Sequence, residues 1–254
     1  LFYRLNQPTN LTAAEQRNAY FGEARQQVKE LSELMLDIGY DSELLGFSNS
    51  RMAYDDVIAK VLLTLEQGTL RRKITANTVT ARYRESEGFS LDLISETRGL
   101  IELLFTVLSE NPLVNKLNKA TLHSWFLFAY KFQRSSYNIK VFSKFYDIFS
   151  QMTLFGASES HLGFLFSADF VDNTLAIFQD RASSRVADTS SVVLRDLSIW
   201  IVFLYCFSDE IKNNHELTKL IELIGANDKQ NDLKSHENIL SYIVEVIRWG
   251  EDFG

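Results

Sequence analysis

Apolar residues recur at steps of three and four along most of the chain, the spacing that places them on one side of an α-helix. Residues 24–39 illustrate the pattern, because Val28, Leu31 and Met35 follow this spacing and polar residues fill many of the other positions. Gly39 then supplies a residue that tolerates the left-handed conformation of a helix C-cap. The segment is therefore predicted to be an amphipathic helix with one buried face.

Similar helical patterns cover much of the remaining chain. The segments that show them are residues 52–68, 91–111, 120–133, 138–152, 167–179, 192–207, 215–225 and 237–249. Thr12 and Glu15 match a capping box, in which a hydroxyl accepts an amide hydrogen bond and a carboxylate three residues later reaches back. Ser48 or Asn49 is expected to cap the next long helix, which Gly68 ends.

Two segments depart from this pattern. The Thr and Val residues of 69–86 favour a strand, while the place of the segment among helices favours a helix, which we expect. Residues 1–6 are expected to form a short edge strand or to pack Leu1, Phe2 and Leu5 against the helices. The predicted fold class is all-α, a multi-helix domain of about ten helices, with or without that short N-terminal edge strand.

Composition supports this fold class and leaves the domain count open. The 254 residues include only 2 Pro and 11 Gly, which disfavours a turn-rich sandwich or barrel. Small polar residues gather at 156–163 and again at 181–191. The first stretch is the favoured boundary, between a helical domain at 1–155 and a C-terminal helical subdomain at 156–254. A single domain is the alternative.

Cysteine content and hydropathy indicate a cytoplasmic protein. Cys206 is the single cysteine, so the chain has neither an internal disulfide nor a zinc site built from several cysteines. The most apolar stretch lies between Asp196 and Asp209 and is shorter than the roughly 20 residues that span a bilayer. We expect it to be a buried core helix, and we expect no contact with a membrane.

Charge is distributed unevenly along this acidic chain, whose formal net charge is −7. Residues 67–84 and 111–146 contain no acidic residue, and Trp125, Tyr130 and Phe132 interleave with cations in the second stretch. Cations beside aromatic rings are typical of nucleic-acid contact, although a solvated basic face or docking to an acidic protein surface remains an alternative. The candidate DNA-contacting residues are Arg71, Arg72, Lys73, Arg82, Arg84, Lys131, Arg134 and Lys140.

Sequence motifs for catalysis are missing. The chain has no P-loop, no GxGxxG and no HExxH, and its four histidines lie far apart. His236-Glu237-Asn238 is expected to lie on a surface helix, and Asp55-Asp56 on the polar side of a helix. We therefore name no catalytic residue, metal ligand or cofactor in this chain and predict no NTP hydrolysis by it alone, with an enzyme whose site these motifs do not reveal as an alternative.

Two segments resemble a large family of bacterial proteins with a sulfiredoxin/ParB-like N-terminal region, which includes the specificity half of GmrSD-type, modification-dependent restriction enzymes and related phage-defence proteins. The first segment matches the family pattern at Phe2, Arg4, Leu5, Asn6, Leu11, Thr12, Glu15, Arg17, Asn18, Ala19 and Gly22. The second segment matches at Ser48, Asn49, Arg51, Met52 and Asp55. The resemblance extends in helical character to about residue 150.

The resemblance implies that a nucleotidase core with an Asp-Gly-Gln-Gln-Arg motif precedes this region and that an HNH-type nuclease follows, in cis or in trans. The chain would then be a helical module that senses or positions nucleic acid, with nucleotide and divalent metal bound in the parent protein. The implied nucleotide or nucleic-acid contacts are Arg4, Asn6, Glu15, Arg17 and Asn18. Helix capping, ion pairing and turn formation by the same residues are the alternative. The alternative function is a non-catalytic helical scaffold for protein–protein interaction.

Overall fold

The computed structural model describes residues 10–111, 116–135, 137–157, 165–211, 214–227 and 233–253, and these residues form an all-α fold. They contain twelve α-helices, one 3-10 turn and no strand. The helices are α2 (Ala13–Arg17), α3 (Glu23–Ile38), α4 (Ser42–Leu45), α5 (Ala53–Gln67), α6 (Ala76–Tyr83), α7 (Leu91–Glu110), α8 (Lys119–Arg134), α9 (Ile139–Phe155), α10 (Ala168–Ser183), α11 (Thr189–Phe207), α12 (His215–Asn227) and α13 (Leu233–Ile247), with the 3-10 turn η2 at Ser208–Glu210. The predicted edge strand at residues 1–6 lies outside the described residues.

Helix starts and ends follow the local signals in the sequence. The capping box at α2 is present, with Thr12 N donating to Glu15 Oε2 at 2.6 Å and Glu15 N donating to Thr12 Oγ1 at 3.2 Å. Gly39 ends α3 at φ 109° and Gly68 ends α5 at φ 61°, both in the left-handed conformation that glycine adopts without strain. The predicted helix stops are confirmed, but the predicted cap of α5 is wrong, because Met52 and neither Ser48 nor Asn49 is its N-cap residue.

The helical prediction for residues 69–86 is only half right. Helix α6 covers residues 76–83, and a capping box between Thr75 and Thr78 starts it. The preceding residues are not helical, because their hydrogen-bonding groups pair with the far end of the chain. Leu70 N donates to Gly250 O at 2.8 Å, and Thr69 Oγ1 donates to the same carbonyl at 2.8 Å.

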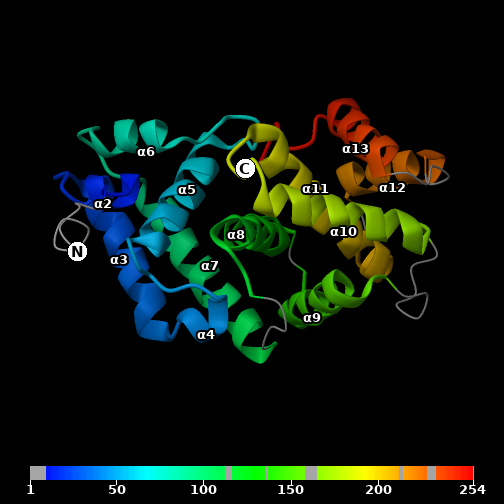
Figure 1. The fold of residues 1–254 in the computed structure, drawn as a ribbon, viewed down its shortest axis with the longest axis horizontal. Coiled ribbons are helices and arrows are strands. Elements are labelled where there is room, and N and C mark those ends of the chain that lie inside the picture. Colours follow the sequence, from blue (N-terminus) through cyan, green and yellow to red (C-terminus); the bar gives the residue numbers. More distant parts are fainter. Residues whose placement is uncertain are drawn as a thin grey trace, which may run out of the picture.

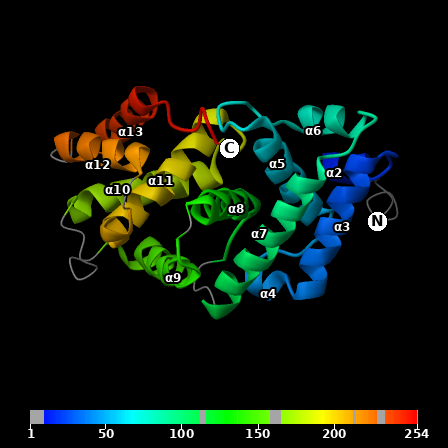
Figure 2. The same cartoon turned by 180° about the vertical axis from the view of Figure 1, so that it is seen from behind.

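Helix α8 occupies the centre of the molecule. Figure 1 shows it end-on between α2–α7 on one side and α9–α13 on the other, and Figure 2 shows the same arrangement from behind. It packs against α5 and α7 on the first side and against α10 and α11 on the second. A chain segment with acid-free sequence therefore lies at the middle of the fold.

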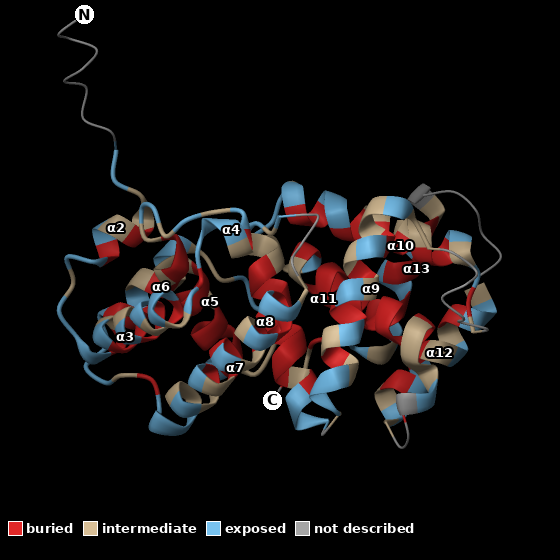
Figure 3. Ribbon diagram, turned by 90° about the horizontal axis from the view of Figure 1, so that it is seen from below, coloured by how far each residue is buried: buried red, intermediate tan, exposed pale blue. Residues whose placement is uncertain are grey.

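One hydrophobic cluster connects both sides. It includes residues from Ala24 to Phe253, and α5, α8 and α11 carry many of its buried side chains (Figure 3). Trp125 of α8 is 2% exposed, and its ring lies against those of Tyr146 and Phe149 of α9, with centroids 4.7 and 5.1 Å away. The segments 1–155 and 156–254 thus share a core, and much of the favoured boundary at 156–163 lies outside the described residues.

Helix α11 is the most apolar helix among the described residues. By length and composition Thr189–Phe207 could cross a membrane, with a mean hydropathy of 1.6, but 78% of the relevant window is buried inside the fold. It is the buried core helix that the sequence predicts. Arg195 and Asp196 lie in its middle at 1% and 0% exposure, so this helix also carries two buried charged residues.

Helix α13 carries one residue whose predicted position is wrong. The sequence predicted His236 on a surface helix, but it is fully buried, and its Nε2 lies 2.9 Å from Thr174 Oγ1 of α10. The neighbouring Glu237 pairs with Arg181, also on α10. The face of α13 that holds His236 is therefore its packing face, because α13 rests on α10.

Buried Asp196 predicts a dependence of stability on pH. Burial raises its pKa to about 6, although Lys131 and the hydrogen bond from Trp249 Nε1 at 2.8 Å oppose the rise. The folded state then binds a proton more tightly than the unfolded state, so stability falls as pH rises from about 4 through 6. The loss is on the order of 3 kcal/mol across this window.

Urea unfolding of wild type and Asp196→Asn between pH 4 and 7.5 tests this dependence. We expect the free energy of unfolding of the variant, relative to that of wild type, to increase steadily as pH rises through the window. Asp37→Asn, at an exposed position on α3, serves as the control. The difference in free energy of unfolding between this control and wild type should stay constant across the same pH range. Parallel pH profiles for wild type and Asp196→Asn would contradict the prediction.

Candidate functional site

The two segments that carry the family resemblance meet in space. Helix α2 packs on the start of α5, and Arg51, just before α5, reaches Glu15 with Nη2–Oε2 at 3.1 Å and Nε–Oε2 at 3.2 Å. The hydrogen bond from Thr12 N and the guanidinium of Arg51 lower the pKa of Glu15 to about 2. Glu15 is therefore an anion that closes the capping box and holds Arg51.

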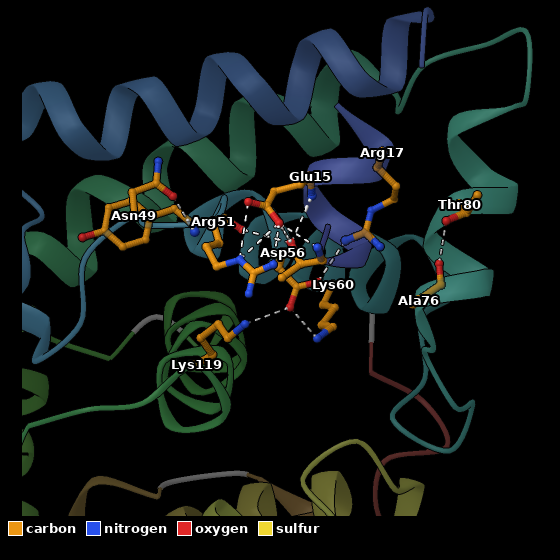
Figure 4. Close-up of polar contacts among 11 residues, drawn as sticks. Glu15, Arg17, Asn49, Arg51, Asp56, Lys60, Ala76, Thr80 and Lys119 are labelled. Atoms are coloured by element: carbon orange, nitrogen blue, oxygen red, sulfur yellow. Dashed lines mark hydrogen bonds and ion pairs between the residues drawn. The ribbon is translucent and has the colours of Figure 1, made fainter. Parts of the chain in front are cut away.

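Asp56 is the centre of a second group of charges beside this pair (Figure 4). Its Oδ1 accepts a hydrogen bond from Arg17 Nη2 at 2.9 Å, and its Oδ2 lies 2.8 Å from Lys60 Nζ and 3.6 Å from Lys119 Nζ. Burial raises the pKa of Asp56, but Lys60, Lys119 and Arg17 outweigh it, and the pKa is lowered overall. One carboxylate thus holds three cations that come from α2, α5 and α8.

The implied nucleic-acid contacts that are described, Glu15, Arg17 and Asn18, all have internal partners. Arg17 is 2% exposed and packs near Tyr83 as well as pairing with Asp56, while its Nη1 is buried without a hydrogen-bond partner in the described part of the chain. Asn18 ends α2, and its Oδ1 accepts from Arg25 Nη2 at 2.6 Å. Arg4 and Asn6 lie outside the described residues.

A cleft of about 700 Å³ lies beside these charges. Its walls come from α2, the turn before α5, α5 itself and the start of α8, and the cations Arg51, Lys60 and Lys119 line it. Lys119 is the most open of the three, with 53% of its side chain exposed. Asp56 is the one carboxylate among the described residues of the lining, where cations outnumber acids.

Most candidates of the first basic stretch are paired with acids or carbonyls from elsewhere. Arg71 Nη2 donates to Val244 O at 2.8 Å and its Nη1 lies 3.1 Å from Glu245. The other pairs are Lys73 with Asp188 at 2.7 Å, Arg82 with Glu66 at 2.9 Å, and Arg84 with the Tyr20 hydroxyl at 2.7 Å. Arg72 is exposed and makes no ion pair with the described residues.

The second basic stretch likewise contains both cations that have partners within the fold and an exposed cation that has no acidic partner among the described residues. Lys131 lies over the rings of Trp249 and Phe253, and Arg134 pairs with Glu96 at 3.3 Å. Lys140 is exposed, with no acidic partner within the described ranges. The rings of Trp125, Tyr130 and Phe132 are buried at 5% exposure or less, so they pack inside the fold and cannot stack on bases.

The sequence missed the role of Asp56 and Lys60. Their i, i+4 spacing on α5 was a signal for an ion pair, but nothing in it showed that Arg17 and Lys119 would join them. Across the described ranges, no group of three or more His, Cys, Asp or Glu side chains could hold a metal ion.

Comparison with known proteins identifies no relative. The chain matches no protein-family model, no curated protein and no solved structure.

Proposed function

We propose that the chain is the helical module of a GmrSD-like, modification-dependent restriction or anti-phage defence protein of the bacterial cytoplasm. In this proposal it positions nucleic acid and couples it to a nucleotidase core and a nuclease outside this chain, in cis or in trans. Nucleotide and divalent metal would bind in that core. The observation that carries the proposal is the contact between the two resembling segments through Glu15–Arg51 and Arg17–Asp56.

The charges at this contact suit a polyanion. Lys60 and Lys119 are held by one carboxylate that they share with Arg17, so positive charge remains in excess beside the cleft. Phosphate groups bind such sites by ion pairing, and their affinity falls steeply with salt. Exposed Leu11 and Phe21, at 60% and 99% exposure, flank α2 and offer an apolar surface for docking of a second domain.

Duplex DNA binding by purified chain at low salt tests the proposal. The variant Arg72→Gln/Lys119→Gln removes two open cations without touching the Arg71 or Arg82 pairs. We expect weaker binding and a log–log salt slope smaller by roughly one for each ion pair with a phosphate that the variant removes. Lys140→Gln tests the second basic stretch in the same way.

The matched control is Lys29→Gln, a partly exposed lysine on α3 that pairs with Glu33 as Lys60 pairs with Asp56. It should bind DNA as wild type does. Wild-type protein that fails to bind duplex DNA at low salt, or variants that bind with unchanged salt slope, would favour the protein–protein scaffold instead.

A further inference from the structure

A second cavity adjoins Asp56, between α5, the α5–α6 connection and the starts of α8 and α11. Its volume is about 210 Å³, the space of roughly seven water molecules. Asp56, Lys60 and Lys119 line both this cavity and the cleft described above, so the two hollows meet at the same three side chains. We call the second cavity the basic pocket.

Positive charge dominates the basic pocket. Among the described residues, five cationic side chains line it and Asp56 is the one carboxylate in the lining. Asp188 outside the lining pairs with one of the five at 2.7 Å. Two carboxylates thus face five cations, and Asp56 is shared with Arg17 as well. The cations are Lys60, Arg72, Lys73, Lys119 and Arg195.

Arg195 is the least expected of these cations because it is buried in the core helix α11 at 1% exposure. Its Nε donates to Ser124 Oγ at 2.9 Å, and its Nη1 donates to Arg181 O at 2.7 Å and Val186 O at 3.1 Å. No carboxylate of the described residues forms an ion pair with it. Burial lowers its pKa to about 10, which leaves the guanidinium charged at neutral pH.

A buried charge without a counter-ion is costly, and proteins usually retain one only where something compensates it. Ser124 Oγ and two backbone carbonyls accept hydrogen bonds from Arg195, but none of these groups carries a negative charge, and His123 beside the pocket is neutral. Burial together with the charges of Arg195 and Lys60 lowers its pKa to about 3. An anion in the basic pocket would supply the missing negative charge.

The remaining walls define what kind of anion fits. Thr189 lines the pocket at the first turn of the 19-residue helix α11, whose N-cap Asp188 makes no side-chain capping bond. Amides at such a turn favour a phosphate oxygen. Val57, Leu70 and Ile74 also line the pocket, and this apolar wall suits the carbon body of the ligand.

We propose that the basic pocket binds the phosphate end of a nucleotide, with the phosphate held between Lys60, Lys119 and Arg195 and the sugar against the apolar wall. The volume holds the phosphate and sugar only, so the base extends toward the neighbouring cleft. The phosphate belongs either to a free nucleotide or to a nucleic-acid strand. This inference is independent of the family resemblance and rests on the pocket alone.

Titration calorimetry and thermal unfolding at constant ionic strength test the pocket with three probes: inorganic phosphate, adenosine 5′-monophosphate and adenosine. We expect the monophosphate to bind and to raise the melting temperature, phosphate to bind more weakly, and adenosine to have no effect. Lys119→Gln should raise the Kd for the monophosphate about tenfold, because it removes one charge-assisted hydrogen bond. Arg195→Met should abolish binding.

Lys29→Gln again is the control and should bind the monophosphate as wild type does. If Arg195→Met fails to fold, Lys119→Gln, at a partly exposed position, still decides the result. Wild type that binds neither phosphate probe, or Lys119→Gln that binds as tightly as the control, overturns the proposal.

A short single-stranded oligonucleotide without terminal phosphate identifies the source of the phosphate. Displacement of the bound monophosphate assigns the pocket to a nucleic-acid strand, and its retention assigns the pocket to a free nucleotide. Monophosphate binding in a protein that never binds DNA keeps the basic pocket and removes the proposed nucleic-acid function. DNA binding without monophosphate binding keeps the proposed nucleic-acid function and rules out the basic pocket as a phosphate site.

Discussion

Trp125→Ala is expected to lower the free energy of unfolding by about 4 kcal/mol, in the range of the largest effects that single core substitutions produce. The indole is 2% exposed and lies among five aromatic rings of α8 and α9, two of which are Tyr146 and Phe149. Removing it leaves a cavity that rings anchored on two helices cannot close. Urea unfolding followed by circular dichroism measures the change.

Phe21→Ala provides the matched control, since that ring is 99% exposed and its loss should change stability by less than about 0.5 kcal/mol. Trp125→Phe should recover most of the stability because a ring remains in the cluster. A Trp125→Ala protein as stable as wild type would contradict the core role of the indole.

Asp56→Ala is expected to destabilise the fold by about 3 kcal/mol, because it leaves buried Arg17 without its carboxylate and brings three cations together unopposed. Since the pKa of Asp56 is lowered in the folded state, its contribution is complete above the unfolded value near 4 and is lost as pH falls below it. The difference between wild type and variant should therefore shrink in acid.

Urea unfolding at pH 7 and at pH 3 measures both parts of this expectation. Asp37→Ala removes an exposed carboxylate from α3 and should leave stability nearly unchanged at either pH. Double substitution of Asp56 and Arg17 by Ala should lower the free energy of unfolding by less than the sum of the two single substitutions. Each single substitution leaves the charge of the remaining residue without its partner. Additive effects would show that the pair contributes little.

Most of the fold could be predicted from local sequence. Capping at Thr12 and Glu15, the stops at Gly39 and Gly68, and the long amphipathic helices all depend on residues within a few positions of one another. The short helix α4 escaped notice because a single turn carries too few apolar positions to show a period. The extended start of the segment at 69–86 escaped because distant backbone groups decide it.

The candidate site could be predicted far less well, since its charges come together only after folding. An acid-free stretch of sequence is not an acid-free surface. Arg71 forms an ion pair with Glu245, and Arg82 forms one with Glu66. Cations that have no acidic neighbour in the sequence are therefore neutralised by acids that are distant in sequence. Conversely, Arg195 has Asp196 as its sequence neighbour, yet that carboxylate accepts a hydrogen bond from Trp249 and leaves the guanidinium without an acidic partner among the described residues.

The joining of residues 68–71 to residues 244–253 has a consequence for how the protein is made. Gly68 O accepts from Phe253 N at 2.8 Å, and Arg71 binds Val244 O and Trp249 O, across sequence separations of more than 170 residues. A ribosome that has produced α2–α8 has not yet supplied these partners. Residues 68–71 of the nascent chain therefore cannot form these hydrogen bonds until residue 253 has been synthesised. Until then, one wall of the basic pocket lacks the contacts that hold it in place. Chaperones that shield exposed apolar surface would meet this protein during that interval.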